Sequence, residues 1–140
     1  MPFEVWLNFE AASDVLYSVV YEAESEGQNA AYFDAVKAYT VELTEAYGEP
    51  VTSDGRTFYL SDFDSYAEAP KAGAACRDVW NVPLEGALAE RMPLTFTYKG
   101  ETTEFSKLYA IVTAAFDERG SRETSECRIE YRVVQEDVLY

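Results

Sequence analysis

Carboxylates are the chemically versatile side chains that this sequence offers in quantity. The chain has 26 acidic residues, two cysteines and no histidine. Paired carboxylates can serve a glycoside hydrolase or hold a metal ion. The pairs Asp62 with Asp64 and Glu22 with Glu24 match no known ligand spacing, and the glycine and glutamate positions of an EF-hand loop are absent. Because acids are so numerous, we expect most of them to be solvated surface groups.

The absence of histidine excludes several kinds of catalytic site. Ser-His-Asp and Cys-His nucleophiles, His-ligated zinc and the usual general base at neutral pH all need an imidazole. Glycine-rich phosphate-binding loops are also absent. The sequence therefore predicts a protein without catalytic residues, cofactor or metal site. An enzyme that uses carboxylate chemistry is the remaining catalytic alternative.

Cys76 and Cys127 leave two alternatives open. They could form one disulfide, whose loop of about 50 residues would stabilise the fold by roughly 4 kcal/mol in the chain-entropy model. They could also be reduced thiols in or near the core. A disulfide would indicate a periplasmic or secreted protein, whereas the chain without one slightly favours the cytoplasm, because no signal peptide is visible. With no histidine to activate either thiol, we expect no activity that depends on a cysteine nucleophile.

The negative charge is large and unevenly distributed. The formal net charge is −15; residues 1–70 hold 14 acids and two bases, and residues 71–140 hold 12 acids and nine bases. Such a charge repels nucleic acids and anionic membranes and accelerates encounter with a basic protein. No apolar run is long enough for a transmembrane helix. We therefore expect a basic protein partner, no direct nucleic-acid binding and no membrane insertion; adaptation to high salt is another explanation of the acidity.

Two groups of residues form the predicted partner-binding surface. The first group occupies alternate positions, so that on a strand its carboxylates project from one face about 6.6 Å apart. The second group interleaves aromatic rings, which supply contact area, with acids, which steer association. The alternatives are an edge strand protected by charge and a loop packed down by its rings. The two groups are Glu22, Glu24 and Glu26, and Tyr59, Asp62, Phe63, Asp64, Tyr66 and Glu68.

The elements that position the first group follow from hydrophobic periodicity. Residues 3–10 alternate apolar and polar side chains and predict a half-buried strand. Residues 14–26 fit either a helix or a strand, and their valine and tyrosine content favours a strand that forms a hairpin with the first. We expect the side chains of Phe3, Val5, Leu7 and Phe9 to share one face of this hairpin.

A long helix is the clearest element of the sequence. Apolar residues recur at helical spacing from about 30 to 47, Asn29 can cap the start, and Gly48 suits the end. The helix should pack its apolar stripe on a sheet. The stripe consists of Tyr32, Val36, Tyr39 and Leu43.

The remaining elements are mostly strands. Residues 56–60 predict a short strand, 64–76 a loop, 78–82 a strand, and 83–92 a helical turn that starts at Pro83. Residues 93–105 predict a hairpin around Lys99-Gly100, 107–116 a central strand, 117–126 a loop, and 127–134 a strand that alternates apolar with charged residues.

These elements together predict an α+β protein. We expect residues 1–140 to form a single compact domain, with an antiparallel or mixed β-sheet and one long amphipathic helix (about 30–47) packed on one face. The predicted function is that of a small acidic, non-catalytic binding protein that occludes a basic, nucleic-acid-binding type of site on a partner. Immunity proteins, nuclease inhibitors and phage-encoded or plasmid-encoded anti-defence proteins act in this manner. The alternative is a small exported bacterial envelope or secreted domain with one disulfide.

Overall fold

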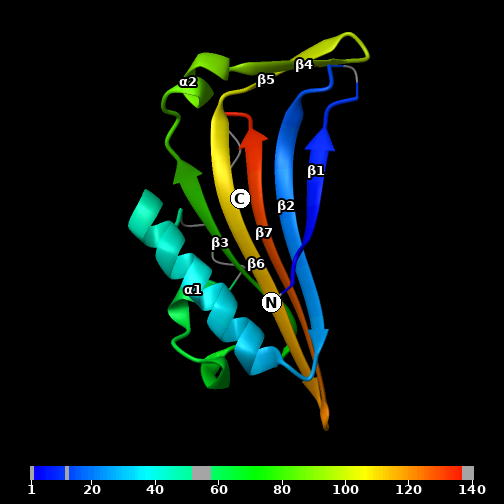
Figure 1. The fold of residues 1–140 in the computed structure, drawn as a ribbon, viewed down its shortest axis with the longest axis vertical. Helices are drawn as coiled ribbons and strands as arrows, with labels where there is room; N and C mark the ends of the chain where they lie inside the picture. Colours follow the sequence, from blue (N-terminus) through cyan, green and yellow to red (C-terminus); the bar gives the residue numbers. More distant parts are fainter. Residues whose placement is uncertain (1, 12, 52–57, 137–140) are drawn as a thin grey trace.

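The computed structural model describes residues 2–11, 13–51 and 58–136. Their five-stranded sheet has the order β1-β2-β7-β6-β3, all neighbours are antiparallel, and a separate hairpin pairs β4 with β5 (Figure 1). The strands are β1 (Glu4–Phe9), β2 (Leu16–Glu26), β3 (Ala72–Val82), β4 (Leu94–Tyr98), β5 (Glu101–Phe105), β6 (Lys107–Arg119) and β7 (Arg122–Val134). The helices are α1 (Asn29–Tyr47), the short α2 (Ala87–Arg91), and the 3-10 turns η1 (Leu60–Asp62) and η2 (Tyr66–Glu68). The α+β class is confirmed.

The N-terminal hairpin confirms the strand prediction for both segments. β1 and β2 pair with Trp6 opposite Val20 and Leu7 opposite Val19. The β-branched residues of β2 suit an inner strand that pairs with β1 on one edge and with β7 on the other. Residues 14–26 are therefore strand from Leu16 onward.

Helix α1 confirms the predicted helix, which begins one residue earlier than expected. Tyr32, Val36 and Leu43 are buried as predicted, and Phe33 is fully buried as well. Tyr39 is 37% exposed, which contradicts its predicted burial. It lies at the margin of the stripe, where its ring meets that of Phe3 with centroids 5.9 Å apart.

Asn29 does not cap this helix, contrary to the sequence-based expectation. Gln28 occupies the N-cap position, and its side chain makes no capping hydrogen bond. Asn29 is fully buried instead, and its Nδ2 donates to the hydroxyl of Tyr66 at 3.0 Å and to the carbonyl of Asp117 at 3.2 Å. Gly48 ends the helix with a positive φ of 88°, as predicted.

Helix α1 covers only part of the sheet. It contacts β3, β6 and β7 through its apolar stripe and crosses the sheet obliquely (Figure 1). The main core lies in this contact and includes Trp80, Val112 and Phe116 from the strands. The same side of β1 and β2 carries Val5, Leu7 and Phe9, each more than half exposed. The helix thus packs mainly on three of the five strands, β3, β6 and β7.

The β-rich second half agrees with the prediction in part. The β4–β5 hairpin turns at Lys99 and Gly100, whose φ angles of 49° and 79° are those of a type I′ turn. Residues 107–116 and 127–134 lie in inner strands, as expected. Residues 117–126 are not a loop, because β6 and β7 continue their pairing to a tight turn at Gly120 and Ser121.

Three further predictions for the middle of the chain are wrong. The first is the short strand at residues 56–60, of which residues 56 and 57 lie outside the described part. Phe58 makes only an isolated parallel bridge to Cys76, and residues 60–62 form a 3-10 turn. The predicted loop 64–76 contains η2 and the first residues of β3. The helical turn begins at Ala87 after Gly86, not at Pro83.

Candidate protein-binding surface

The three glutamates of β2 project from one side of the sheet, as their alternation predicted. Their neighbours Tyr21 and Ala23 face the α1 side, so the glutamates lie on the far side. The antiparallel strand β7 places arginines beside two of them. The Nε of Arg128 lies 3.9 Å from Oε1 of Glu22, and the Nη2 of Arg122 lies 3.3 Å from Oε1 of Glu26.

These ion pairs reduce the negative charge of the row. Exposed pairs of this kind contribute about 0–1 kcal/mol to stability, so their main effect is electrostatic. Glu24 differs because it stands opposite Glu126 in the β2–β7 register. Only the middle carboxylate of the predicted row therefore faces another acid.

The aromatic residues of the second predicted group serve internal packing. The ring of Tyr66 lies 5.6 Å from Phe116 and 6.3 Å from Phe33, and burial raises its pKa. The ring of Phe63 lies 6.2 Å from that of Phe58 and packs against the main core. Tyr59, next to η1, is half-buried. The packed-loop alternative describes these rings better than exposed anchors do.

The acids of the second group remain on the surface. Asp62, Asp64 and Glu68 are exposed, and Glu68 accepts a hydrogen bond of 3.1 Å from the backbone N–H of Asp64. They lie in and between the turns η1 and η2, which run beside α1 (Figure 1). The β2 glutamates lie on the opposite side of the sheet. The two predicted groups therefore do not form one continuous surface.

Two lysines in this region direct their charges inward. The Nζ of Lys71 donates to the carbonyls of Tyr66, Ala67 and Ala69 at 2.8, 2.9 and 3.1 Å. The Nζ of Lys37 on α1 donates to the carbonyl of Ser61 at 2.9 Å. Both ammonium groups thus hold the backbone of η1 and η2 in place. Their hydrogen bonds go to backbone carbonyls, and neither ammonium group lies within 4.0 Å of a carboxylate oxygen among the described residues.

The consequence is an acidic surface that we call the outer acidic layer. All its carboxylates are exposed, and none lies within 4.0 Å of a lysine or arginine nitrogen among the described residues. Its members lie on α1, at Glu49 just after the helix, and in and between the two 3-10 turns. Its members are Asp34, Glu42, Glu45, Glu49, Asp62, Asp64 and Glu68.

Asp78 on β3 is a carboxylate of a different kind. It is fully buried and accepts hydrogen bonds from the backbone N–H of Ser61 at 2.9 Å and from its hydroxyl at 3.2 Å. Burial raises the pKa of this carboxyl, although the Ser61 bonds oppose the shift. Asp78 therefore fixes η1 to the sheet. Across residues 2–11, 13–51 and 58–136, no group of three or more acids or cysteines is arranged to hold a metal ion.

Cys76 and Cys127 are free thiols, which corrects the disulfide alternative. Cys76 stands opposite Ala114, and Ala114 stands opposite Cys127, so the central strand β6 separates them. Two strand spacings amount to about 9.6 Å, beyond the roughly 7 Å that a disulfide can span. Burial raises the pKa of Cys76 to about 11 and that of Cys127 to about 12, which suppresses the nucleophilic thiolate.

We expect both thiols to be unreactive in the folded protein. Ellman's reagent should titrate none of them rapidly under native conditions and two after denaturation without reductant, because both side chains are buried and their pKa values are raised. Two free thiols in denaturant agree with the structure. The absence of free thiols there would show that the cysteines are bridged.

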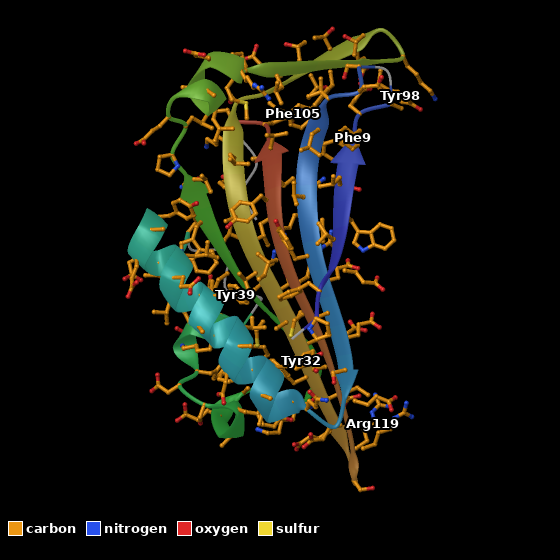
Figure 2. The ribbon with its side chains drawn as sticks, in the orientation of Figure 1. Phe9, Tyr32, Tyr39, Tyr98, Phe105 and Arg119 are labelled. Atoms are coloured by element: carbon orange, nitrogen blue, oxygen red, sulfur yellow. The ribbon has the colours of Figure 1, made fainter. Side chains whose placement is uncertain are left out.

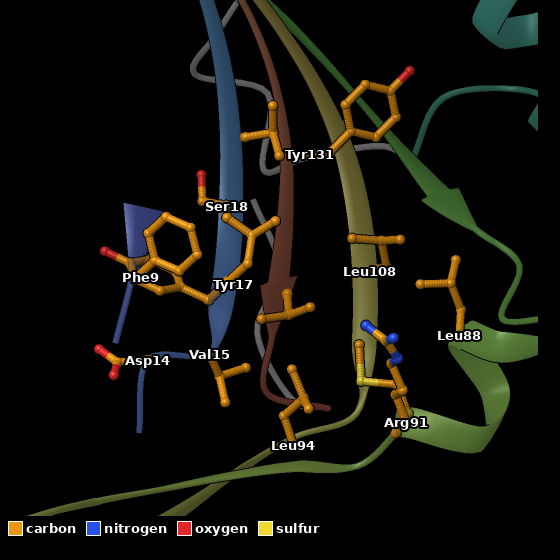
Figure 3. A pocket seen from close by; sticks show the side chains of 14 residues that line it. Phe9, Asp14, Val15, Tyr17, Ser18, Leu88, Arg91, Leu94, Leu108 and Tyr131 are labelled. Atoms are coloured by element: carbon orange, nitrogen blue, oxygen red, sulfur yellow. The ribbon is translucent and has the colours of Figure 1, made fainter. Parts of the chain in front are cut away.

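The uncovered part of the sheet contains a hollow that sequence reasoning did not find. Its volume is about 660 Å³, and it lies on the α1 side, between the β1–β2 hairpin, the sheet and α2 (Figure 3). Most of its lining is apolar, with Arg91 and Asp14 on opposite sides. The lining includes Phe9, Tyr17, Leu88, Leu94, Leu108 and Val133.

A second, smaller hollow continues this surface toward α1. It has a volume of about 330 Å³ and shares Tyr131 with the first. Phe3, Tyr21, Tyr39 and Glu42 line it, so one member of the outer acidic layer stands at its wall. The exposed side chains of Tyr39 and Phe9 mark the two ends of this apolar surface in Figure 2. The strict alternation of residues 3–9 was the available signal, but it could not show that one strand face stays uncovered.

Comparisons with family models, with curated proteins and with solved structures find no match for this chain. Neither α1 nor any other helix among the described residues has the length and hydropathy needed to span a bilayer.

Proposed function

We propose that this protein is a non-catalytic binding protein that occludes a basic surface, of the kind that binds nucleic acids, on a partner protein. The observation that supports this proposal is that Lys37 and Lys71 turn their amino groups toward the backbone of η1 and η2. Because both ammonium groups bond backbone carbonyls, seven exposed carboxylates share one region without a compensating cation among the described residues. Unneutralised charge of one sign attracts a surface of the opposite sign and accelerates its association.

The hollows beside α1 would supply the apolar part of such an interface. Protein interfaces usually combine an apolar centre with a polar rim, and aromatic side chains are enriched at the centre. Tyr39 and Phe3 border the smaller hollow, while Glu42 and Glu45 follow on the same helix. A basic partner with one protruding apolar side chain could contact the carboxylates of the outer acidic layer and fill the hollow at the same time. In this arrangement the outer acidic layer steers the partner, and the hollow holds it.

A charge-reversal experiment tests the proposal. The variant Asp34→Lys/Glu45→Lys/Asp62→Lys changes the outer acidic layer, and Glu85→Lys/Glu101→Lys/Glu104→Lys is its matched control at exposed positions near α2 and the β4–β5 hairpin. Each triple variant raises the formal charge by two units per substitution, from −15 to −9. Immobilised wild type and both variants are used to capture proteins from a lysate of the source organism at low ionic strength.

The expected result is a basic protein that wild type and control retain and that the first variant loses. With the purified partner, the association rate should fall about tenfold or more in the first variant and should also fall for wild type as salt rises. Equal binding by both variants, or an acidic partner, would mean that the acidity serves solubility alone.

A further inference from the structure

Strand β1 forms an unprotected edge of the sheet. Among the described residues it pairs only with β2, and Figure 1 shows it at the free margin of the sheet. Its large apolar side chains are unusually accessible: Val5 is 54% exposed, Trp6 53%, Leu7 55% and Phe9 53%. Natural edge strands usually carry a lysine, a proline or an inward-facing charge that prevents pairing with another chain. β1 has no lysine, no proline and no charge on its α1 side; its one charged residue is Glu4 on the far side, and its ladder with β2 shifts register only at the end, between Asn8 and Phe9.

The side chains around β1 follow a palindromic pattern centred on Trp6. The residues on either side of it, Val5 and Leu7, are aliphatic. Two positions away both residues are polar, and three positions away both are phenylalanine. These outer pairs are Glu4 with Asn8 and Phe3 with Phe9. A strand with this symmetry is complementary to a second copy of itself in the antiparallel direction.

We propose that β1 is the dimerisation edge of this protein. Two copies join β1 to β1 in antiparallel orientation, with Trp6 on the two-fold axis, and their five-stranded sheets become one sheet of ten strands. An isologous contact of this kind uses the same surface patch on both subunits. Strand β1 carries none of the carboxylates of the outer acidic layer, so dimerisation through this edge does not depend on the proposed function.

The register follows from symmetry and side-chain chemistry. A two-fold axis perpendicular to the sheet keeps each side chain on its own side, so paired residues must have position numbers of equal parity. With Trp6 central, Val5 faces Leu7 of the second copy and Glu4 faces Asn8, and such cross-strand pairs contribute about 0.2–1 kcal/mol each. The next permitted register in one direction sets Glu4 opposite Glu10, and the next in the other direction brings Pro2 into the ladder.

The net charge predicts a diagnostic salt dependence. Two copies of a chain with a charge of −15 repel each other at long range, and salt screens this repulsion. Dimerisation should therefore strengthen as salt rises. Binding of a basic partner by the outer acidic layer should weaken under the same conditions, so the two proposals can fail independently.

Disulfide trapping tests the register directly. In the proposed dimer, residue 6 of one copy faces residue 6 of the other at a Cα separation of about 4.5–5.5 Å, which a disulfide can span. Trp6→Cys should therefore form a covalent dimer rapidly on mild oxidation. Val41→Cys on α1 is the matched control, because Val41 is 48% exposed, and it should stay monomeric. The native thiols are buried and contribute little background.

Sedimentation of the untrapped protein gives a second, independent measurement. Wild type should dimerise, Leu7→Lys should weaken the dimer about tenfold or more, and the control Val41→Lys should leave it unchanged. With fluorotryptophan incorporated, the fluorine resonance of exposed Trp6 should shift with protein concentration, while that of the fully buried Trp80 should not. A wild-type protein that stays monomeric up to about 1 mM, or a dimer that Leu7→Lys leaves intact, would overturn the proposal.

Discussion

Replacing Val112 by aspartate is expected to destabilise the protein by about 3–5 kcal/mol, a large fraction of the roughly 5–15 kcal/mol of a typical domain. Val112 is fully buried in the inner strand β6, and its cross-strand neighbour on β3 is the buried Asp78. The substitution would place two carboxylates side by side away from water. Lys37 is the cation that acts on Asp78, and its ammonium group bonds a backbone carbonyl of η1, so it would not neutralise both carboxylates.

The effect of Val112→Asp should depend on pH. Because the pKa of Asp78 is raised in the folded protein, the folded state holds this proton more tightly than the unfolded state. Stability therefore falls as pH rises from the ordinary aspartate pKa through the raised value. A second buried carboxyl group beside Asp78 also favours its protonated form in the folded protein. The difference in unfolding free energy between variant and wild type should therefore shrink at acid pH, where both groups are neutral. Urea unfolding at several pH values measures it.

Thr113→Asp is the matched control for this prediction. The residue is next to Val112 in the same strand but faces the far side of the sheet, where Arg77 and Arg128 are its cross-strand neighbours. A new carboxylate between two arginines at this half-buried position should change stability by no more than about 1 kcal/mol. Equal destabilisation by both substitutions would contradict the placement of the two strand faces.

Truncation of Phe33 is the second prediction with a large effect. Phe33→Ala should cost about 3–5 kcal/mol, because a fully buried ring leaves a cavity that its neighbours fill only in part. The ring joins α1 to β6 and to η2 through Phe116 at 5.7 Å and Tyr66 at 6.3 Å. Chemical denaturation should show the loss as a lower midpoint with a similar slope.

Val41→Ala serves as the control on the same helix. Val41 is about half exposed, so its truncation should change stability by no more than about 0.5 kcal/mol. Similar costs for both substitutions would show that α1 does not bury its Phe33 face against the sheet.

Sequence periodicity correctly predicted those elements that carry a clear signal in their own residues. Helix α1 has a consistent apolar stripe and a terminal glycine, and the β4–β5 turn has a residue pair suited to positive φ. The ends of β6 and β7 lack such a signal, since residues 117–126 are polar on both faces. They form strands because the inner segments of β6 and β7 already fix the register, and the backbone pairing continues to the turn at Gly120.

The candidate binding residues were predicted less completely, because their surroundings come from distant parts of the chain. Alternation was sufficient to place Glu22, Glu24 and Glu26 on one side of β2. The arginines beside them lie on β7, about 100 residues later, and only the strand order brings them together. Similarly, the burial of Tyr66 requires the neighbouring Phe33 and Phe116, which no local pattern around residue 66 could indicate.

The inward lysines also determine how the protein reacts with amine-directed reagents. Of its four lysines, Lys37 and Lys71 have their amino groups engaged by carbonyls, whereas Lys99 is exposed at the hairpin turn and Lys107 begins β6 nearby. Acylation of lysine side chains therefore favours the hairpin end of the molecule. A sensor surface coupled through these amines would hold the protein by that end and would leave the carboxylates of α1 directed toward the solution.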